Sequence, residues 1–152
     1  MTIRCEVVSQ DKVVYEGDVD IVIAPSTSGE MGILPNHAPL LATLDFGIIK
    51  VRSNGVEEIF TVSGGIIEVQ PDIVTILADV AENVLEIDIA RAEAAKNRAE
   101  KYLSEGPPPD TDTYLKLDAA LRRSKLRLNA VKRYKPGRRT TISPMLDDET
   151  QK

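Results

Sequence analysis

The hydrophobic pattern of this chain changes its period near residue 87, and no other sequence feature constrains the fold as strongly. Before this point the sequence is a series of short runs rich in β-branched residues, about 8–12 residues apart and bounded by turn residues. From Asp88 to Glu105 apolar residues recur at steps of three and four, without Gly or Pro. We therefore predict an all-β N-terminal sandwich or barrel followed by helices.

Eight short runs in the first part of the chain fit strands, and together they indicate an antiparallel sandwich or barrel. They cover residues 3–8, 12–15, 19–23, 41–44, 47–52, 58–62, 65–69 and 73–77. Asn54-Gly55 predicts a hairpin turn, because Asn and Gly tolerate positive φ. Ser63-Gly64 and Gln70-Pro71-Asp72 are expected to interrupt the strands on either side of them.

The helical part is predicted to be an antiparallel hairpin. Gly106 and the prolines that follow it stop the first helix, and Asp110 or Thr111 can cap a second helix that runs to about Tyr134. In that second helix, residues suited to a narrow helix–helix seam recur at steps of three and four: Tyr114, Leu117, Leu121, Ser124, Leu128 and Val131. Because each helix buries only one seam, we expect the hairpin to hold weakly to the β-domain and to be able to detach.

These patterns divide the chain into a β-domain of residues 1–86, a helical hairpin of residues 87–135, and a tail of residues 136–152 whose polar composition predicts disorder. The charges follow nearly the same division. Residues 1–87 carry fourteen acidic and four basic side chains, whereas residues 88–152 carry ten acidic and fifteen basic ones. Such an asymmetry predicts two halves with different functions.

Features that the sequence lacks exclude several classes of protein. The single cysteine, Cys5, lies in an apolar run and cannot form an internal disulfide, which favours a reducing compartment. No basic region followed by an apolar stretch marks a signal peptide. No apolar run approaches the ~20 residues needed to span a bilayer. We therefore expect membrane association only through a partner.

Residues 29–41, Gly-Glu-Met-Gly-Ile-Leu-Pro-Asn-His-Ala-Pro-Leu-Leu, are too apolar for an ordinary surface loop. Glycine permits positive φ and proline fixes φ, so we interpret the segment as a tightly shaped, partly buried connection between strands. Met31, Ile33 and Leu34 are expected to anchor this connection in the sandwich. Glu30 and His37 are expected to face outward.

The same thirteen residues resemble the signature of the epsilon subunit of F-type ATP synthases of the bacterial and chloroplast type. Phe46-Gly47 fits this family, as does Val62-Ser63-Gly64-Gly65 followed by a hydrophobic strand. The order of a β-sandwich, a helix, a turn and a second helix fits as well. The resemblance covers roughly residues 2–134.

The resemblance implies a non-catalytic rotor subunit of the central stalk, which couples ion-driven rotation to ATP synthesis. It implies that the sandwich binds the gamma subunit and rests on the ring of c subunits, with Glu30, Met31 and His37 at this interface. The hairpin is expected to fold onto the sandwich or to extend toward the alpha/beta catalytic head. In the extended state it would meet an acidic segment of beta and inhibit ATP hydrolysis.

The location implied by the resemblance is peripheral. The chain would lie on the cytoplasmic face of the bacterial plasma membrane, or on the stromal side of the thylakoid, as part of the F1 sector. Contact with the membrane would be made only through the complex.

Residues 87–92, Ile-Asp-Ile-Ala-Arg-Ala, resemble the Ile/Leu-Asp-x-x-Arg-Ala motif by which some bacterial epsilon subunits bind ATP. The family pattern also has a glutamate at the position of Glu82. Its two arginines on the second helix correspond to Arg123 and Arg127 if the turn between the helices is about two residues longer here.

The residue types in this motif suit a nucleotide. Asp88, Arg91 and Arg98 share one face of the first helix. Arginine binds phosphate through a planar fork that stays charged, while an aspartate can accept a hydrogen bond from the adenine amino group. The implied ATP site consists of Glu82, Ile87, Asp88, Arg91, Arg98, Arg123 and Arg127.

A simpler interpretation of these arginines is a solvated face that pairs with Glu or Asp along the hairpin. The basic stripe from Arg122 to Arg139 also permits nucleic-acid binding, but the acidic first half and the lack of interleaved aromatics argue against it. An acidic protein surface is the better partner for this stripe.

Catalysis by this chain is not expected. His37, the sole histidine, has no Ser, Cys or carboxylate pair at a useful spacing. No cluster of His and Cys predicts a metal site, and no Walker-type loop predicts nucleotide hydrolysis. We therefore expect no catalytic residue, no metal and no cofactor, with ATP as a regulatory ligand. The competing hypothesis is a free-standing ATP-binding regulatory module without a rotor role, which co-purification with a gamma subunit would exclude.

Overall fold

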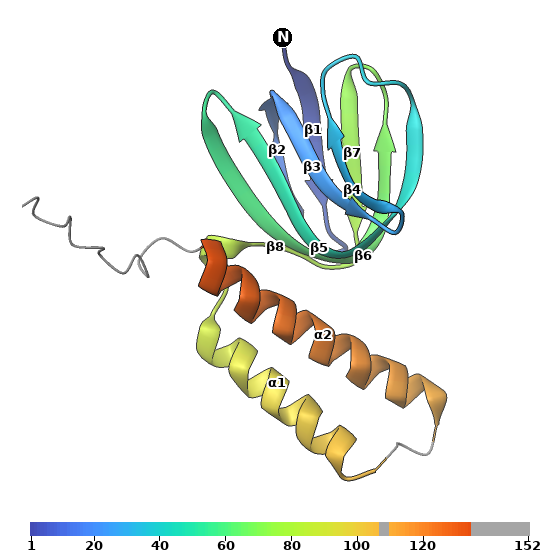
Figure 1. Cartoon of the computed structure of the whole chain (residues 1–152), viewed down its shortest axis with the longest axis vertical. Helices are drawn as coiled ribbons and strands as arrows, with labels where there is room; N and C mark the ends of the chain where they lie inside the picture. Colours follow the sequence, from blue (N-terminus) through green and yellow to red (C-terminus); the bar gives the residue numbers. More distant parts are fainter. Residues whose placement is uncertain (107–109, 135–152) are drawn as a thin grey trace, which may run out of the picture.

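The strands and helices of this chain form two parts, a β-domain and a pair of antiparallel helices below it in the view of Figure 1. The computed structural model describes residues 1–106 and 110–134. The predicted β-sandwich followed by a helical hairpin is confirmed. The elements in chain order are β1 (Ile3–Val8), β2 (Val13–Val19), β3 (Ile21–Ser26), β4 (Gly29–Ile33), β5 (Leu40–Ser53), β6 (Val56–Val69), β7 (Ile73–Ala78), β8 (Ala81–Asn83), the 3-10 turn η1 (Val84–Glu86), α1 (Ile89–Ser104) and α2 (Thr111–Tyr134).

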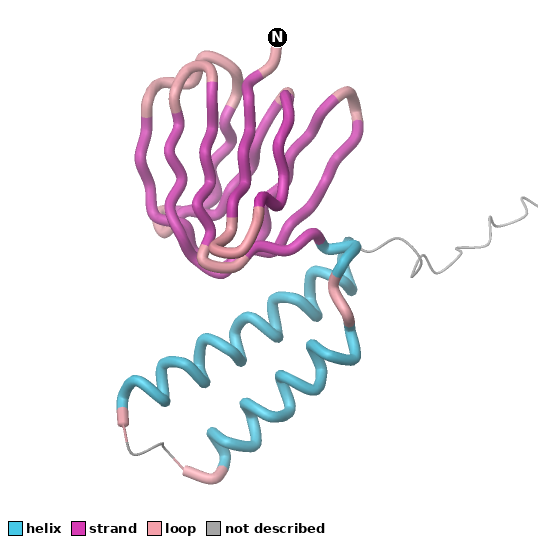
Figure 2. Tube along the Cα trace, turned by 180° about the vertical axis from the view of Figure 1, so that it is seen from behind, coloured by secondary structure: helices cyan, strands magenta, loops and turns pink. Residues whose placement is uncertain are grey.

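The eight strands form one sheet that folds over on itself, as the tube in Figure 2 shows. Its order is β2-β1-β7-β6-β5-β3-β4, and β8 pairs with β6. Neighbouring strands are antiparallel except β1 and β7, which run parallel. β5 and β6 have 14 residues each and are paired along their whole length. These two long strands run through both layers of the folded sheet and connect them.

The bend in β6 depends on glycine and explains one difference from the sequence prediction. Gly64 and Gly65 have φ values of 86° and 128°. A Cβ atom on Gly65 would lie 2.2 Å from the carbonyl oxygen of Leu77. Glycine therefore lets the strand bend toward β7 while its pairing with β5 continues. The predicted strands 41–44 and 47–52 are consequently parts of β5, and 58–62 and 65–69 are parts of β6.

Residues 29–33 also differ from the prediction, because they form the edge strand β4 rather than a connection. This strand pairs antiparallel with β3 along its whole length. Ile33 is fully buried and Met31 packs against the core, as expected. Leu34 is 57% exposed, so the expectation that it anchors the segment is wrong. Leu34 follows the end of β4, and its side chain is no longer directed by the sheet.

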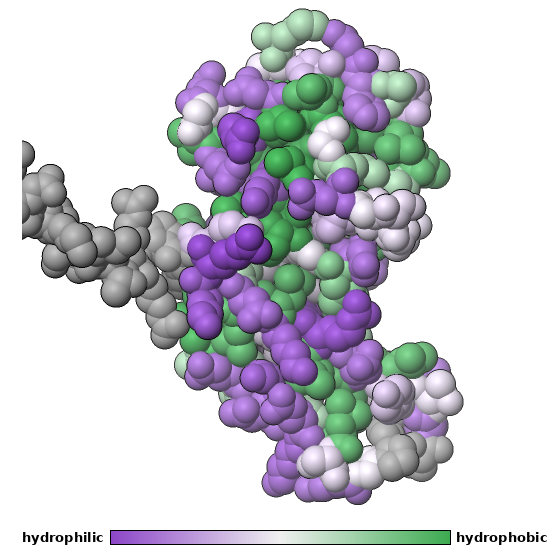
Figure 3. Space-filling view, viewed as in Figure 1, coloured by the Kyte–Doolittle hydropathy of each residue, from purple (hydrophilic) through white to green (hydrophobic). Residues whose placement is uncertain are grey.

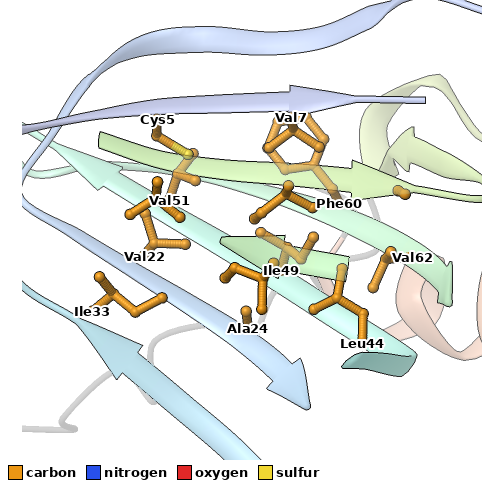
Figure 4. Packing of buried hydrophobic residues seen from close by; sticks show 14 of the residues in the cluster. Cys5, Val7, Val22, Ala24, Ile33, Leu44, Ile49, Val51, Phe60 and Val62 are labelled. Atoms are coloured by element: carbon orange, nitrogen blue, oxygen red, sulfur yellow. The ribbon is translucent and has the colours of Figure 1, made fainter. Parts of the chain in front are cut away.

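The hydrophobic core lies between the two layers of the folded sheet, where the labelled side chains of Figure 4 converge. Burial alternates along β1 and β3, because successive side chains of a strand point to opposite faces. Phe60 is the largest fully buried side chain of the described residues, and its ring meets the ring of Tyr15 in an edge-on contact with 5.8 Å between centroids. Small and β-branched side chains fill the remaining space.

The two helices begin at aspartates and meet through small residues. Asp88 caps α1, and the Oδ1 atom of Asp110 accepts a hydrogen bond of 2.7 Å from the backbone N–H of Thr113 at the start of α2. The buried residues of the seam include Ala92, Ala99 and Ser124. The predicted seam residue Tyr114 is 45% exposed, and Tyr102 near the end of α1 is 58% exposed, so neither ring is buried in the seam.

The hairpin contacts the β-domain chiefly through α2, which packs on β5, β6 and η1. A second, small cluster of buried residues forms this contact, and Ile48, Ile59, Ile89 and Tyr134 pack around it. Its members are Val84, Ile87, Ala130 and Val131. The prediction of disorder for residues 136–152 lies outside the described residues. Of the helices that are described, none has the length and apolar composition needed to cross a membrane.

Candidate functional site

A cleft of about 220 Å³ lies where the β-domain joins the hairpin. β8 and η1 form one side of the cleft, the first turn of α1 another, and α2 contributes a side chain from its second half. The lining residues are Glu82, Glu86, Ile87, Asp88, Arg91, Ala92 and Arg127. The cleft therefore brings together five of the seven residues predicted for the ATP site, although they come from segments up to 45 residues apart.

Glu82 and Arg127 close one side of this cleft with a two-pronged ion pair. The Nε atom of Arg127 donates to Oε2 of Glu82 at 2.9 Å, and its Nη2 atom donates to Oε1. The two side chains are only 23% and 32% exposed. A fork-to-carboxylate pair of this kind is stronger than an ordinary surface ion pair, because two charge-assisted hydrogen bonds form in a partly desolvated place. This pair connects α2 directly to β8.

Asp88 and Ile87 owe their positions to the start of α1. The Oδ1 atom of Asp88 accepts a hydrogen bond of 3.1 Å from the backbone N–H of Arg91, which leaves Oδ2 available to a ligand. Ile87 is 4% exposed and belongs to the small cluster under the cleft. Arg91 is exposed at its rim. The cleft thus combines an apolar floor, carboxylates and two guanidinium groups.

Arg98 and Arg123 are not among the residues that line the cleft. Arg98 is exposed two turns farther along α1, where it lines a different hollow with Lys101, Tyr102 and Glu105. Arg123 is half-buried on α2, one turn before Arg127. Its Nε atom is buried and lacks a hydrogen-bond partner among the described residues. Five residues of the predicted site therefore lie together in the cleft, whereas Arg98 and Arg123 lie outside it.

The residues predicted for the subunit interface lie in β4 and in the loop after it. Glu30 is exposed, and Met31 is half-buried against the core. His37 is half-buried, with its Nδ1 atom 2.7 Å from the carbonyl oxygen of Ala38. Within residues 1–106 and 110–134, no three His, Cys, Asp or Glu side chains are grouped in a way that could hold a metal ion.

Sequence reasoning missed two groups of residues. Glu86 and Ala92 complete the lining of the cleft, and both adjoin the motif, so a wider reading of residues 82–92 would have included them. The second group is a row of apolar side chains across the outer face of β2, β1, β7 and β6, set by the pairs Val13–Val8, Val8–Leu77 and Leu77–Ile66.

The side chains of this outer row are open to solvent. Val13, Ile66 and Leu77 are 57%, 44% and 49% exposed. Figure 3 shows hydrophobic areas on the surface of the β-domain beside hydrophilic ones. The signal in the sequence is a pair of adjacent apolar residues, Ile66-Ile67 or Ile76-Leu77. Adjacent residues of a strand point to opposite faces, and a strand that is apolar on both faces is typical of a sheet covered on both faces. Exposed apolar patches of this kind mark interaction surfaces.

Comparison with protein families decides what kind of protein carries this cleft. Residues 2–84 match the model of the beta-sandwich domain of the ATP synthase delta/epsilon chain, and residues 86–132 match the model of its long alpha-helix domain. The chain belongs to the ATP synthase delta/epsilon chain family. The resemblance inferred from residues 29–41 is confirmed.

Relatives and solved structures agree with this family assignment. The ATP synthase epsilon chain of Halalkalibacterium halodurans is 43% identical over 132 residues, which cover 87% of this chain and 98% of the relative. A chain in the Euglena gracilis mitochondrial ATP synthase, OSCP/F1/c-ring in rotational state 1, has a TM-score of 0.71 at 24% identity and covers 86% of this chain and 81% of its own length. A chain in the Tetrahymena thermophila mitochondrial ATP synthase, central stalk/c-ring, has a TM-score of 0.54 at 20% identity, with 86% and 97% covered.

Membership in the delta/epsilon family makes this chain an epsilon-type subunit of an ATP synthase. The two structural matches are below 25% identity and show a common fold. The family models end at residue 132, so residues 133–152 lie beyond them.

Proposed function

We propose that this chain is a non-catalytic regulatory subunit of the ATP synthase rotor, in which the hairpin restrains ATP hydrolysis and ATP holds the hairpin against the β-domain. The observation that carries the proposal is the cleft between the β-domain and the hairpin. A ligand in this cleft touches β8, α1 and α2 at once, so it stabilises only the arrangement in which the hairpin is folded down. By linkage, such a ligand shifts the population toward that arrangement.

The charges in the cleft support a nucleotide bound in one orientation. Glu82 and Asp88 provide carboxylate oxygens that can accept from the amino group of adenine, and Ile87 provides apolar contact for the ring. Arg91 and Arg127 provide the guanidinium groups that suit phosphate. Phosphates would be repelled by Asp88 and would compete with Glu82 for Arg127, so we place the base beside Asp88 and the phosphates toward Arg91 and Arg127.

The size of the cleft defines how far a nucleotide would extend. Common ligand pockets have volumes of about 300–1,000 Å³, and this cleft holds about 220 Å³. We therefore place the base in the cleft and the outer phosphates along the hairpin, toward Arg98 and Arg123. There a rotation of the Arg123 side chain would give its buried Nε atom the acceptor that it lacks among the described residues.

The two charge classes of the chain support different partners for its two parts. α2 presents the exposed basic residues Arg122, Lys125, Lys132 and Arg133, which complement an acidic segment of beta when the hairpin extends toward the alpha/beta head. The outer apolar row of the β-domain and the segment that contains Glu30, Met31 and His37 would contact the gamma subunit and the c-subunit ring. The chain would then lie peripherally at the membrane, on the cytoplasmic face in a bacterium or the stromal face in a thylakoid.

The nucleotide site is tested by calorimetric titration of ATP without Mg²⁺ into the full chain. We expect the wild type to bind and Arg91→Ala to bind at least about tenfold more weakly, because a hydrogen bond to a charged group contributes about 1.5–3 kcal/mol. Lys125→Ala is the matched control, since it removes one positive charge from an exposed position outside the cleft. No binding by the wild type at millimolar ATP, or equal affinity in Arg91→Ala, would contradict the site.

The regulatory role is tested in the assembled complex. A chain truncated after Ile87 lacks both helices and retains the β-domain. We expect it to co-purify with a gamma subunit and to raise the ATPase activity of the assembled head. Unchanged hydrolysis would contradict the inhibitory role, and failure of the full chain to co-purify with gamma would favour a free-standing ATP-binding module.

A further inference from the structure

Outside the cleft described above, α2 packs against every second residue of β5 from Phe46 to Lys50. The Cζ atom of Arg122 lies 4.2 Å from the centre of the Phe46 ring. Ile48 packs against the small cluster under the hairpin. The Nζ atom of Lys50 lies 5.1 Å from the centre of the Tyr134 ring. Because residues two apart in a strand point to the same face, β5 offers α2 a continuous strip of three side chains.

Arg122 is held from two directions at the start of this strip. Its guanidinium lies over the face of Phe46, and its Nη2 atom is 3.8 Å from Oδ1 of Asp45. The same Oδ1 atom accepts a hydrogen bond of 2.8 Å from the backbone N–H of Phe46, so the carboxylate is fixed beside the ring. A cation over an aromatic face is attracted by the charge distribution of the ring, and a neighbouring carboxylate adds to this attraction.

We propose that Asp45, Phe46 and Arg122 form a clasp that holds the hairpin in the folded-down position and so sets nucleotide affinity from outside the nucleotide site. Arg122 is a positioning residue here, since it does not line the cleft. It fixes the part of α2 that precedes Arg127, and thereby keeps Arg127 within reach of Glu82 and of a ligand. The effect on nucleotide affinity rests on the proposed function, whereas the clasp itself does not.

The clasp matters because so little else holds the hairpin down. Among the described residues, the cluster that joins the two parts has four buried members, of which one alanine and one valine come from α2. With the Glu82–Arg127 pair, the clasp is one of two charged contacts from α2 to the β-domain that involve a carboxylate, among those in the described part of the chain. The Glu82–Arg127 pair lies in the cleft, where a nucleotide would compete for Arg127. The clasp lies away from the ligand, so it holds α2 whether or not the cleft is filled.

The experiment measures the ratio of released to folded-down hairpin in the full chain without nucleotide. Dyes are attached at Thr27→Cys and Asn97→Cys, both at exposed positions, and energy transfer between them reports the ratio in low urea. The native Cys5 is fully buried and does not take up dye. We expect Arg122→Ala to raise the ratio about five- to tenfold, as loss of a cation–π contact and an exposed ion pair predicts.

Three comparisons separate the clasp from a general loss of stability. Lys125→Ala, one turn from Arg122 with the same loss of charge, should leave the ratio within about twofold of the wild type. Phe46→Leu, which keeps an apolar side chain but removes the ring, should raise the ratio about as much as Arg122→Ala. The double variant should add little beyond either single change, because both remove the same contact. Arg122→Lys should restore part of the wild-type ratio.

Added salt distinguishes a charged contact from an apolar one, because it weakens attraction between charges. The ratio in the wild type should rise with salt more than the ratio in Arg122→Ala does. Equal ratios in the wild type and Arg122→Ala, equal effects of Arg122→Ala and Lys125→Ala, or additive effects of Arg122→Ala and Phe46→Leu would each overturn the clasp. ATP is added afterwards to the same labelled chains. Its failure to bind the wild type would overturn the nucleotide site and leave the result on the clasp intact.

Discussion

The β-domain and the hairpin differ in how much buried apolar surface holds each in place. Among the described residues, eighteen buried side chains form the core of the β-domain, and four form the cluster between the β-domain and the hairpin. Burial of one large aliphatic side chain contributes about 1.5–3 kcal/mol. The β-domain therefore has the apolar core of an independent unit, whereas the hairpin depends on a few contacts.

The contacts that do hold the hairpin are mostly charged or amphipathic. Arg127 meets Glu82, Arg122 meets Phe46 and Asp45, and Lys50 meets the ring of Tyr134. Charged groups are readily solvated, so their separation exposes little apolar surface to water. This difference indicates that the core of the β-domain stays packed, whereas the contact between the β-domain and the hairpin can open.

The largest effect is expected from a cavity in the β-core. Phe60→Ala removes the largest fully buried side chain and its contact with Tyr15. We expect it to lower the free energy of unfolding by about 3–5 kcal/mol. Chemical denaturation should show the loss in the transition of the β-domain. If Phe60→Ala released the hairpin and left the β-domain unchanged, the two cores would not be separate.

A smaller and local effect is expected from the cluster under the hairpin. Val131→Ala removes two methyl groups from a residue that is 2% exposed. We expect a loss of about 1–2 kcal/mol, expressed as release of the hairpin while the sheet stays folded. Hydrogen exchange can follow this, with faster exchange in α1 and α2 and unchanged exchange in β6 and β7. Leu115→Ala, at a position that is 56% exposed, is the control.

The pH dependence of stability should differ between the two parts. Burial, with a smaller effect of the negative charge of Glu6, raises the pKa of Cys5 from 9.0 to about 12. Above pH 9 the unfolded chain therefore loses a proton that the folded chain retains, so this contribution is complete below pH 9 and is lost as the pH rises toward 12. The loss should reach about 1.4 kcal/mol at pH 10.

Cys5→Ala tests this pH effect. Its stability at pH 7 should be lower because of the small cavity. The decline between pH 8 and pH 10 in denaturation of the β-domain should be shallower than in the wild type. An equal decline in both proteins would show that Cys5 is not the group responsible.

The smallest effect is expected at the start of α2. Hydrogen bonds from the backbone N–H of Thr113 and then from its hydroxyl group lower the pKa of Asp110 from 3.8. The folded chain therefore stabilises the ionised form of Asp110. This contribution to the stability is present above pH 3.8 and is lost as the pH falls through the lowered pKa. Asp110→Ala should reduce helicity slightly at pH 7 in circular dichroism, and Asp110→Asn should reduce it less, because asparagine also caps helices.

Prediction from the sequence succeeded where the signal is local and failed where a distant segment decides. The change of period near residue 87 and the cap at Asp110 follow from residue types and spacing along one element, whereas the cap at Asp88 was not predicted. The break expected at Gly64 is absent, because β6 bends there without ending. At the next residue, Gly65, the carbonyl of Leu77 on β7 leaves room for glycine alone. Leu34 was expected to be buried, but β4 ends one residue earlier.

The site shows the same division. Sequence alone determined the types of residue available for a nucleotide and the spacing that puts Arg91 about one turn after Asp88, because a helix repeats every 3.6 residues or so. Only the tertiary structure decided that Arg127 reaches Glu82, that Arg98 and Arg123 stay off the cleft, and that Arg122 rests on Phe46. These contacts join residues 45 to 76 positions apart in the chain. The periodicity of a single element does not predict such a contact. The contact depends on the position of α2 on the sheet, and side-chain packing between the β-domain and the hairpin sets that position.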